Sequence, residues 1–90
     1  MKQSQPQIEH ILTDLLHRKM GIAKQRITSQ SQLIRELGLD SLDAVELIVE
    51  VEKHFNIAIS DEELEEFVTL QDIVACIETK LSLNEKTSLN

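Results

Sequence analysis

Residues 37–55 read LGLDSLDAVELIVEVEKHF, and this stretch decides the fold. Asp40 is a preferred N-cap residue, and Asp43 three positions later can complete a capping box. A helix is therefore predicted to begin at Ser41 and to end near Phe55. Apolar residues at helical spacing cover one wide arc of it, which should face a core. The residues predicted to point inward are Ala44, Val45, Leu47, Ile48, Val51 and Phe55.

The sequence before this stretch predicts a helix followed by a long loop. Pro6 suits the first position of a helix, and the apolar residues that follow keep helical spacing until Gly21 supplies a left-handed stop. Residues 22–37 contain scattered apolar residues without a sustained period. We expect them to form a loop that its apolar side chains hold to the core, with one helical turn at 31–37.

Two further capping boxes follow the central stretch. Ser60 with Glu63 opens a short helix around 61–67, and Thr69 with Asp72 opens a helix around 70–81. Phe55, Ile57 and Ile59 alternate as in a strand, but nothing else in the chain can pair with them, so an extended loop is expected there. The predicted fold class is all-α: a small four-helix bundle with three main helices and one short third helix.

Size and composition limit the function. Ninety residues with 41% apolar side chains suffice for one small core but not for a second layer around a deep substrate cleft, which argues against a self-sufficient enzyme. The expected organisation is a flexible N-terminus at 1–5, a folded domain at 6–81 and a mobile polar tail at 82–90. The single cysteine, Cys76, is expected to be a small core side chain, and no stretch is apolar enough to span a membrane. We expect a monomer of the cytoplasm.

Negative charge is concentrated between residues 40 and 66, where ten acidic side chains are opposed by Lys53 alone. An acidic field of this kind repels nucleic acid and anionic lipid, and it speeds encounter with basic protein surfaces. The outward side of the helix predicted at 41–55 carries part of this charge. Five residues form it: Leu42, Asp43, Glu46, Val49 and Glu50. Exposed apolar residues framed by carboxylates are typical of a protein docking surface.

Ser41 has three possible roles: a residue that merely starts a helix, a nucleophile, or a site of modification. A nucleophile needs an adjacent base, but His54 lies more than three helical turns away and the G-x-S-x-G elbow is absent. A phosphate ester on Ser41 would stand beside the first backbone N–H groups of the helix. The carboxylates of Asp40 and Asp43 oppose an anionic donor, so another enzyme would have to supply metal ions or basic groups.

No metal site is expected from the sequence. His10, Asp14 and His17 share one helical face, but structural zinc wants four ligands and a solvated polar face is the simpler interpretation. The acidic residues at 61–66 lack the EF-hand spacing.

The stretch LGLDSLDAVEL at 37–47 resembles the phosphopantetheine attachment motif of acyl carrier proteins, Leu-Gly-x-Asp-Ser-Leu followed by Asp-x-Val-Glu-Leu. The likeness extends to MGI after the first helix, IRELG in the loop, EVEKHFNIAISDEE, and TLQDIVACI near the end. It implies a four-helix bundle in which a phosphopantetheinyl transferase attaches 4′-phosphopantetheine from coenzyme A to Ser41. The thiol of that arm would carry acyl groups as thioesters between enzymes, so the chain would be a carrier without catalytic residues.

The resemblance also implies roles for the residues around Ser41. Basic patches of the transferase and of acyl-processing enzymes would meet Asp40, Leu42, Asp43, Glu46, Val49 and Glu50. An acyl pocket between the second and third helices would involve Leu47, Val51, Ile59, Leu64 and Phe67. Because Leu64 and Phe67 are bulky for the third helix, a shallower or differently shaped pocket is expected.

Departures from the family pattern bear on the pathway. Lys53 and His54 interrupt an acidic run that is common in carriers of fatty-acid synthesis, and Arg35 takes a position in the loop that is commonly acidic. The leading hypothesis is a discrete carrier of type II fatty-acid synthesis or a related acyl pathway. The alternatives are a specialised carrier for polyketide, lipid A-type or aminoacyl groups, an unmodified acidic helical adaptor protein, and, as the weakest, a small hydrolase that uses Ser41.

Overall fold

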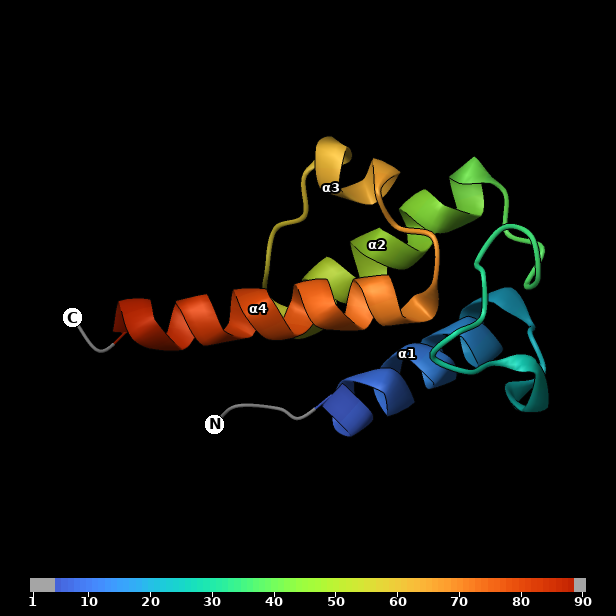
Figure 1. Cartoon of the computed structure of the whole chain (residues 1–90), viewed down its shortest axis with the longest axis horizontal. Helices are drawn as coiled ribbons and strands as arrows, with labels where there is room; N and C mark the ends of the chain where they lie inside the picture. Colours follow the sequence, from blue (N-terminus) through green and yellow to red (C-terminus); the bar gives the residue numbers. More distant parts are fainter. Residues whose placement is uncertain (1–4, 89–90) are drawn as a thin grey trace.

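The computed structural model describes the backbone of residues 5–88 and the side chains of residues 5–83. Its elements, in chain order, are α1 (Gln5–Met20), the 3₁₀ turn η1 (Lys24–Arg26), α2 (Ser41–Phe55), α3 (Asp61–Glu65) and α4 (Leu70–Ser88). Figure 1 shows α1 at the lower edge and α3 at the upper edge, with α2 and α4 between them. The described residues contain no strand, so the predicted all-α bundle of three main helices and one short helix is confirmed.

One apolar core joins the long helices, because α1 packs against both α4 and α2. Buried side chains come from all three, and nine of them are almost completely enclosed: Ile8, Leu12, Leu16, Leu47, Val51, Leu70, Ile73, Val74 and Ile77. The inward face predicted for α2 supplies Leu47, Ile48, Val51 and Phe55 to this core. Val45 is instead 43% exposed and Ala44 is half-buried, because the first turns of α2 border a cavity rather than another helix.

Left-handed residues end two of the helices. Gly21, with φ of 72°, follows α1 as predicted, and its N–H donates to the His17 carbonyl oxygen at 3.1 Å. Asn56, with φ of 56°, caps α2 in the same conformation, and its N–H donates to the Glu52 carbonyl oxygen. Gly and Asn are the residues that adopt this conformation at least cost. Both stops send the chain back along the bundle.

The long loop between α1 and α2 is ordered by contacts with the start of α4. The N–H of Leu70 donates to the Ser31 carbonyl oxygen at 3.1 Å, and Gln32 pairs with Thr69 in an isolated antiparallel bridge. Ser31 is buried, and its hydroxyl accepts from the Thr28 N–H at 2.9 Å. The loop includes η1, which was not predicted. It also includes a turn at 33–37 in the place of the predicted helical turn.

The expected helix ends need three corrections. α4 was expected to end near Leu81, but it runs to Ser88, because Leu, Glu and Lys sustain a helix where no Gly or Pro stops it. The mobility expected of residues 82–90 stays a prediction. α3 ends at Glu65 rather than near residue 67, because the N–H of Phe67 turns to the nearer Leu64 carbonyl. Gln5, assigned to a flexible N-terminus, is helical. The remainder of that terminus, 1–4, and residues 89–90 lie outside the described residues.

Leu12 tests the core, because its side chain is fully buried where α1 meets the other helices. Leu12→Ala should lower the free energy of unfolding by about 2–5 kcal/mol, since it removes buried methyl groups and leaves a cavity. Urea unfolding followed by circular dichroism measures the change. Val68→Ala is the control, because Val68 is 56% exposed and its truncation should cost far less. Equal losses in the two variants would contradict this description of the core.

Candidate functional site

Ser41 is the first residue of α2, and its side chain is exposed. The capping box predicted before it is present. The Asp40 Oδ1 atom accepts from the Asp43 N–H at 2.8 Å, and the Asp43 Oδ2 atom accepts from the Asp40 N–H at 3.3 Å. The Ser41 hydroxyl therefore stands at the positive end of the α2 dipole, where an attached phosphate is electrostatically favoured.

In the turn before Ser41, one side chain is buried in the core and the next two are exposed to solvent. Gly38 adopts φ of 75°, a left-handed conformation that is costly for residues with a side chain. The N–H of Leu39 then donates to the Leu33 carbonyl oxygen at 3.1 Å, and the Leu39 side chain is buried. Asp40, the next residue, is exposed as the cap of α2. A buried Leu39 anchors the chain, and the Asp40 and Ser41 side chains remain accessible.

A cavity of about 250 Å³ opens beside Ser41. It lies between the first half of α2, the loop before it, and α3 with the segment that follows. Its lining is mainly apolar: Leu33, Ile34, Ser41, Ala44, Val45, Leu47, Ile48, Leu64, Glu65, Phe67 and Ile73. An apolar cavity that begins at an exposed hydroxyl suits a hydrocarbon chain tethered near that hydroxyl.

The structure divides the five residues predicted for the acyl pocket. Leu47, Leu64 and Phe67 line the cavity beside Ser41. Val51 is fully buried in the core, and Ile59 is half-buried against it, so neither belongs to the lining. Ile34 and Val45 also line the cavity, although neither was predicted for the pocket. Ile34 was expected to hold the loop to the core, but it is 61% exposed at the cavity.

The predicted docking residues lie on the exposed side of α2 and at its N-terminus. Leu42 is 66% exposed and Val49 is 41% exposed, while Asp40 and Glu46 are exposed. Asp43 and Glu50 are half-buried. Val45 joins Leu42 and Val49 in one exposed apolar stripe, since the three residues stand at helical spacing. That spacing is a signal that the sequence contains, although Val45 was assigned to the inward face.

No histidine lines the cavity that contains Ser41. His54 follows Ser41 in α2 by thirteen positions, which is about 20 Å at the helical rise. On α1, His17 faces the backbone, because its Nδ1 atom lies 2.9 Å from the Ile22 carbonyl oxygen. The hydroxyl of Ser41 therefore lacks the neighbouring histidine that most often serves as the base of a serine nucleophile.

Comparison with known proteins agrees with this geometry. Residues 10–77 match the protein family described as "Phosphopantetheine attachment site". An acyl carrier protein of Phytoplasma australiense is 44% identical over 75 residues, a match that covers 83% of this chain and 97% of the relative. An acyl carrier protein of Thermotoga maritima is 36% identical over 78 residues and covers 87% and 96% of the two chains.

The chain belongs to the acyl carrier protein family.

The resemblance found in LGLDSLDAVEL is thus confirmed over most of the chain. The fold agrees as well, because a crystal structure of an acyl carrier protein from Thermotoga maritima superposes with a TM-score of 0.79. That comparison covers 87% of this chain and 91% of the other at 24% identity, so it bears on the fold alone. Acyl carrier proteins hold phosphopantetheine and are not themselves enzymes, and this chain shares that carrier role. Among its described helices, none has the length and apolar character to cross a membrane.

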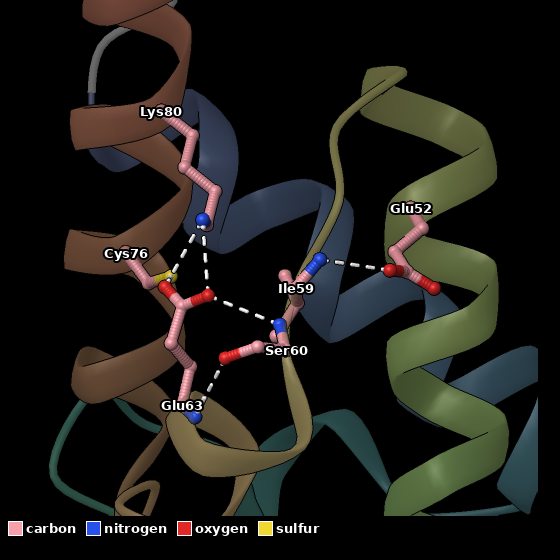
Figure 2. A network of polar contacts seen from close by, with 6 residues as sticks. All are labelled: Glu52, Ile59, Ser60, Glu63, Cys76 and Lys80. Atoms are coloured by element: carbon pink, nitrogen blue, oxygen red, sulfur yellow. Dashed lines mark hydrogen bonds and ion pairs between the residues drawn. The ribbon is translucent and has the colours of Figure 1, made fainter.

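The short helix α3, which forms one wall of the carrier's cavity, is held by polar contacts on its outer side. Figure 2 shows the Glu63 carboxylate between Ser60 at the start of α3 and Lys80 on α4. Glu63 accepts from the Ser60 N–H at 3.0 Å, and its two oxygens lie 3.1 and 3.0 Å from the Lys80 ammonium. These contacts lower the pKa of Glu63 from 4.5 to about 2, the Ser60 N–H having the larger effect.

Cys76 is half-buried beside this ion pair, with its Sγ atom 3.5 Å from the Glu63 carboxylate. Burial and the negative charge of Glu63 raise the pKa of the Cys76 thiol. A thiol with a raised pKa is a poor nucleophile at neutral pH. Cys76 is thus half-buried beside an ion pair and not the core side chain that was expected. The acyl-bearing thiol belongs to the prosthetic group.

Glu63 should contribute to stability in a pH-dependent way. Because folding lowers its pKa, the contribution is complete above the unfolded-state value of about 4.5 and is lost as the pH falls toward 2. Glu63→Gln should lower the free energy of unfolding by up to about 1 kcal/mol at neutral pH, since the pair with Lys80 is partly exposed. Urea unfolding near pH 7 and near pH 3 measures the cost, which should be smaller at the lower pH.

Glu62→Gln is the matched control for this experiment, because Glu62 is exposed on the same helix. It should show no such pH dependence. A cost of Glu63→Gln that is equal at the two pH values would contradict the assigned ion pair.

Proposed function

We propose that Ser41 is the residue to which 4′-phosphopantetheine is attached, and that the chain carries acyl groups as thioesters on the thiol of that arm. The observation that carries the proposal is the exposed Ser41 hydroxyl at the capped start of α2, at the edge of an apolar cavity. The Ser41 Oγ atom would give its proton to a base of the transferase and form the phosphoester bond as the pyrophosphate bond of coenzyme A breaks, with adenosine 3′,5′-bisphosphate as the leaving group. A phosphopantetheinyl transferase would supply the base and the cationic groups, because no histidine, lysine or arginine lines the cavity beside Ser41.

The cavity beside Ser41 is the proposed site of the acyl chain. Burial of methylene groups against apolar side chains is favourable by about 0.8 kcal/mol each. Leu47, Leu64 and Phe67 were expected to serve this purpose, and Val45 and Ile34 add to the same lining. Protection of the thioester from water follows from burial of the chain that bears it. Leu64 and Phe67 line this cavity, which supports the expectation that their bulk makes the pocket shallower or gives it a different shape.

The exposed side of α2 is the proposed docking surface for the transferase and for acyl-processing enzymes with basic patches. The apolar stripe of Leu42, Val45 and Val49 supplies contact area, and the carboxylates of Asp43, Glu46 and Glu50 flank it. Asp40 adds a further charge beside Ser41. Carboxylates of this kind mainly raise the rate of encounter with a basic partner. The proposed compartment is the cytoplasm, and the proposed state is a monomer.

We propose type II fatty-acid synthesis or a closely related acyl pathway as the setting. Relatives named acyl carrier protein support this at 36–44% identity. Three exposed residues that are not acidic lie near the α2 carboxylates in the sequence: Arg35 in the loop before α2, and Lys53 and His54 at the end of α2. A partner that docks on α2 would meet them as well. Partner preference is therefore proposed to differ from that of a carrier with an uninterrupted acidic surface.

Modification of Ser41 is tested by intact-protein mass spectrometry after incubation with coenzyme A, Mg²⁺ and a broad-specificity phosphopantetheinyl transferase. The expected result is one phosphopantetheine on the wild type and none on Ser41→Ala. Ser60→Ala is the control, because Ser60 also caps a helix but lies at α3. An unmodified wild type with two different transferases would overturn the proposal and favour an unmodified adaptor protein.

The docking surface is tested by charge reversal. Glu46→Lys and Glu50→Lys should together slow transfer onto Ser41 by about tenfold or more at low salt, because two attractive charges become repulsive. The difference from wild type should shrink as salt screens the charges. The measurement is the rate of modification across a salt series, with Glu9→Lys on α1 as the control of equal charge change per site. Rates that do not differ at any salt concentration would remove the electrostatic part of the docking proposal.

A further inference from the structure

The wall that α3 gives to the cavity has less apolar packing than the long helices, since Leu64 and Phe67 are only partly buried against the core. α3 has five residues and none of them is buried, whereas an isolated helix of this length is not stable in water. Leu64 and Glu65 of this helix line the cavity, and so does Phe67, two residues after the helix ends. The position of α3 over the cavity must therefore come from its links to the rest of the protein.

Both ends of the α3 segment are held by hydrogen bonds that involve its backbone. On the N-terminal side, the Ile59 N–H donates to the Glu52 carboxylate of α2 at 2.8 Å. On the C-terminal side, the Leu33 N–H donates to the Val68 carbonyl oxygen at 2.9 Å. These ties fix where the segment starts and ends. Between them, Leu64 and Phe67 pack against the core as partly buried side chains, and no fully buried side chain of α3 fixes the tilt of the helix over the cavity.

Glu63 supplies the link in the middle of the segment. Its carboxylate oxygens lie 3.1 and 3.0 Å from the Lys80 ammonium of α4, and the Cys76 Sγ atom lies 3.5 Å away (Figure 2). Glu63 is directly followed by Leu64, which lines the cavity. Because the two residues are adjacent in one helical turn, a fixed Glu63 carboxylate fixes the direction in which the Leu64 side chain enters the cavity.

We infer that the Glu63–Lys80 pair is a latch that holds α3 over the cavity and thereby sets the longest acyl chain that the protein protects. This inference rests on the proposed function, in which the acyl chain lies in that cavity. Glu63 and Lys80 are positioning residues, since neither lines the cavity and both act through Leu64. Chains up to the limit lie beneath the latched helix, and longer chains must displace it.

The Glu63–Lys80 ion pair is weak enough for a longer acyl chain to break it. The side chains of Lys80 and Glu63 are 23% and 38% exposed, so their attraction is that of a partly solvated ion pair. The free energy gained by burial of one or two further methylene groups is of the same size. Release of the latch should therefore move the protected length upward by about two carbons.

The experiment measures thioester protection as a function of chain length. The transferase loads Ser41 directly from acyl-coenzyme A, with saturated chains from butanoyl to dodecanoyl, and intact-protein mass spectrometry follows the cleavage of the thioester by hydroxylamine. For the wild type, cleavage should slow as the chain grows and become faster again beyond the limiting length. Lys80→Met, which keeps the Ser60 to Glu63 cap of α3, should move that limit to longer chains.

Three control variants separate the latch from other effects. Lys80→Arg keeps the positive charge and should restore the wild-type limit. Glu62→Gln removes an exposed carboxylate from α3 and should leave the limit unchanged. Ile77→Val weakens the core away from the cavity, and it should change cleavage at all lengths alike without a shift of the limit.

Each possible failure has a distinct meaning. A limit that is the same in Lys80→Met and wild type overturns the latch and leaves the proposed function intact. Loaded wild-type protein with equal cleavage rates at every length overturns the proposed use of the cavity, and the latch with it. No loading of Ser41 overturns the proposed attachment site itself.

Discussion

The capping box between Asp40 and Asp43 is the interaction on which the functional side of the molecule depends. It fixes the residue at which α2 begins, and a helix start fixes the direction of every later side chain on that helix. One register thereby exposes the Ser41 hydroxyl, buries Leu47 in the core and at the cavity, and turns Leu42 outward. A start displaced by one residue would rotate all three groups by more than a quarter of a turn. The attachment site, the cavity wall and the docking stripe are thus consequences of one local arrangement.

The three long helices are closely packed, whereas the short helix α3 has no buried residue. α1, α2 and α4 share a closed apolar core, and the start of α4 also orders the long loop that leads to Ser41. α3 contributes no buried residue and borders the cavity. A carrier must accept cargo of variable size without unfolding, and a short helix held by partly exposed polar contacts can move while the long helices stay packed. Some carboxylates of α2 and α3 hold the structure, while exposed ones such as Glu46 and Glu62 are available to partners.

Local sequence signals predicted most of the architecture. The three capping boxes and the left-handed Gly21 are short-range features, and the structure contains all of them. Errors occurred where the outcome depends on tertiary neighbours. Val45 lies on the apolar arc of α2, but no helix covers it, and Ile34 is likewise exposed at the cavity. Val51 and Ile59 were assigned to the pocket, but Val51 is buried in the core and Ile59 packs against it. The depth of a cavity depends on tertiary packing, which the sequence pattern does not contain. The pair of Glu63 and Lys80 joins residues seventeen positions apart and has no periodic signature.

The central claim is that one end of α2 holds both the attachment residue and the cavity that receives its cargo. The most direct test is an isotope-edited nuclear Overhauser experiment on the protein bearing a ¹³C-labelled octanoyl chain on its phosphopantetheine. Contacts from the chain to the methyl groups of Leu47 and Leu64 and to the ring of Phe67 are predicted. A second groove, of about 510 Å³, lies between α4 and the segment after α2, where Asn56, Ile57 and Leu83 line it. Contacts to that groove, or to no protein side chain at all, would contradict the claim.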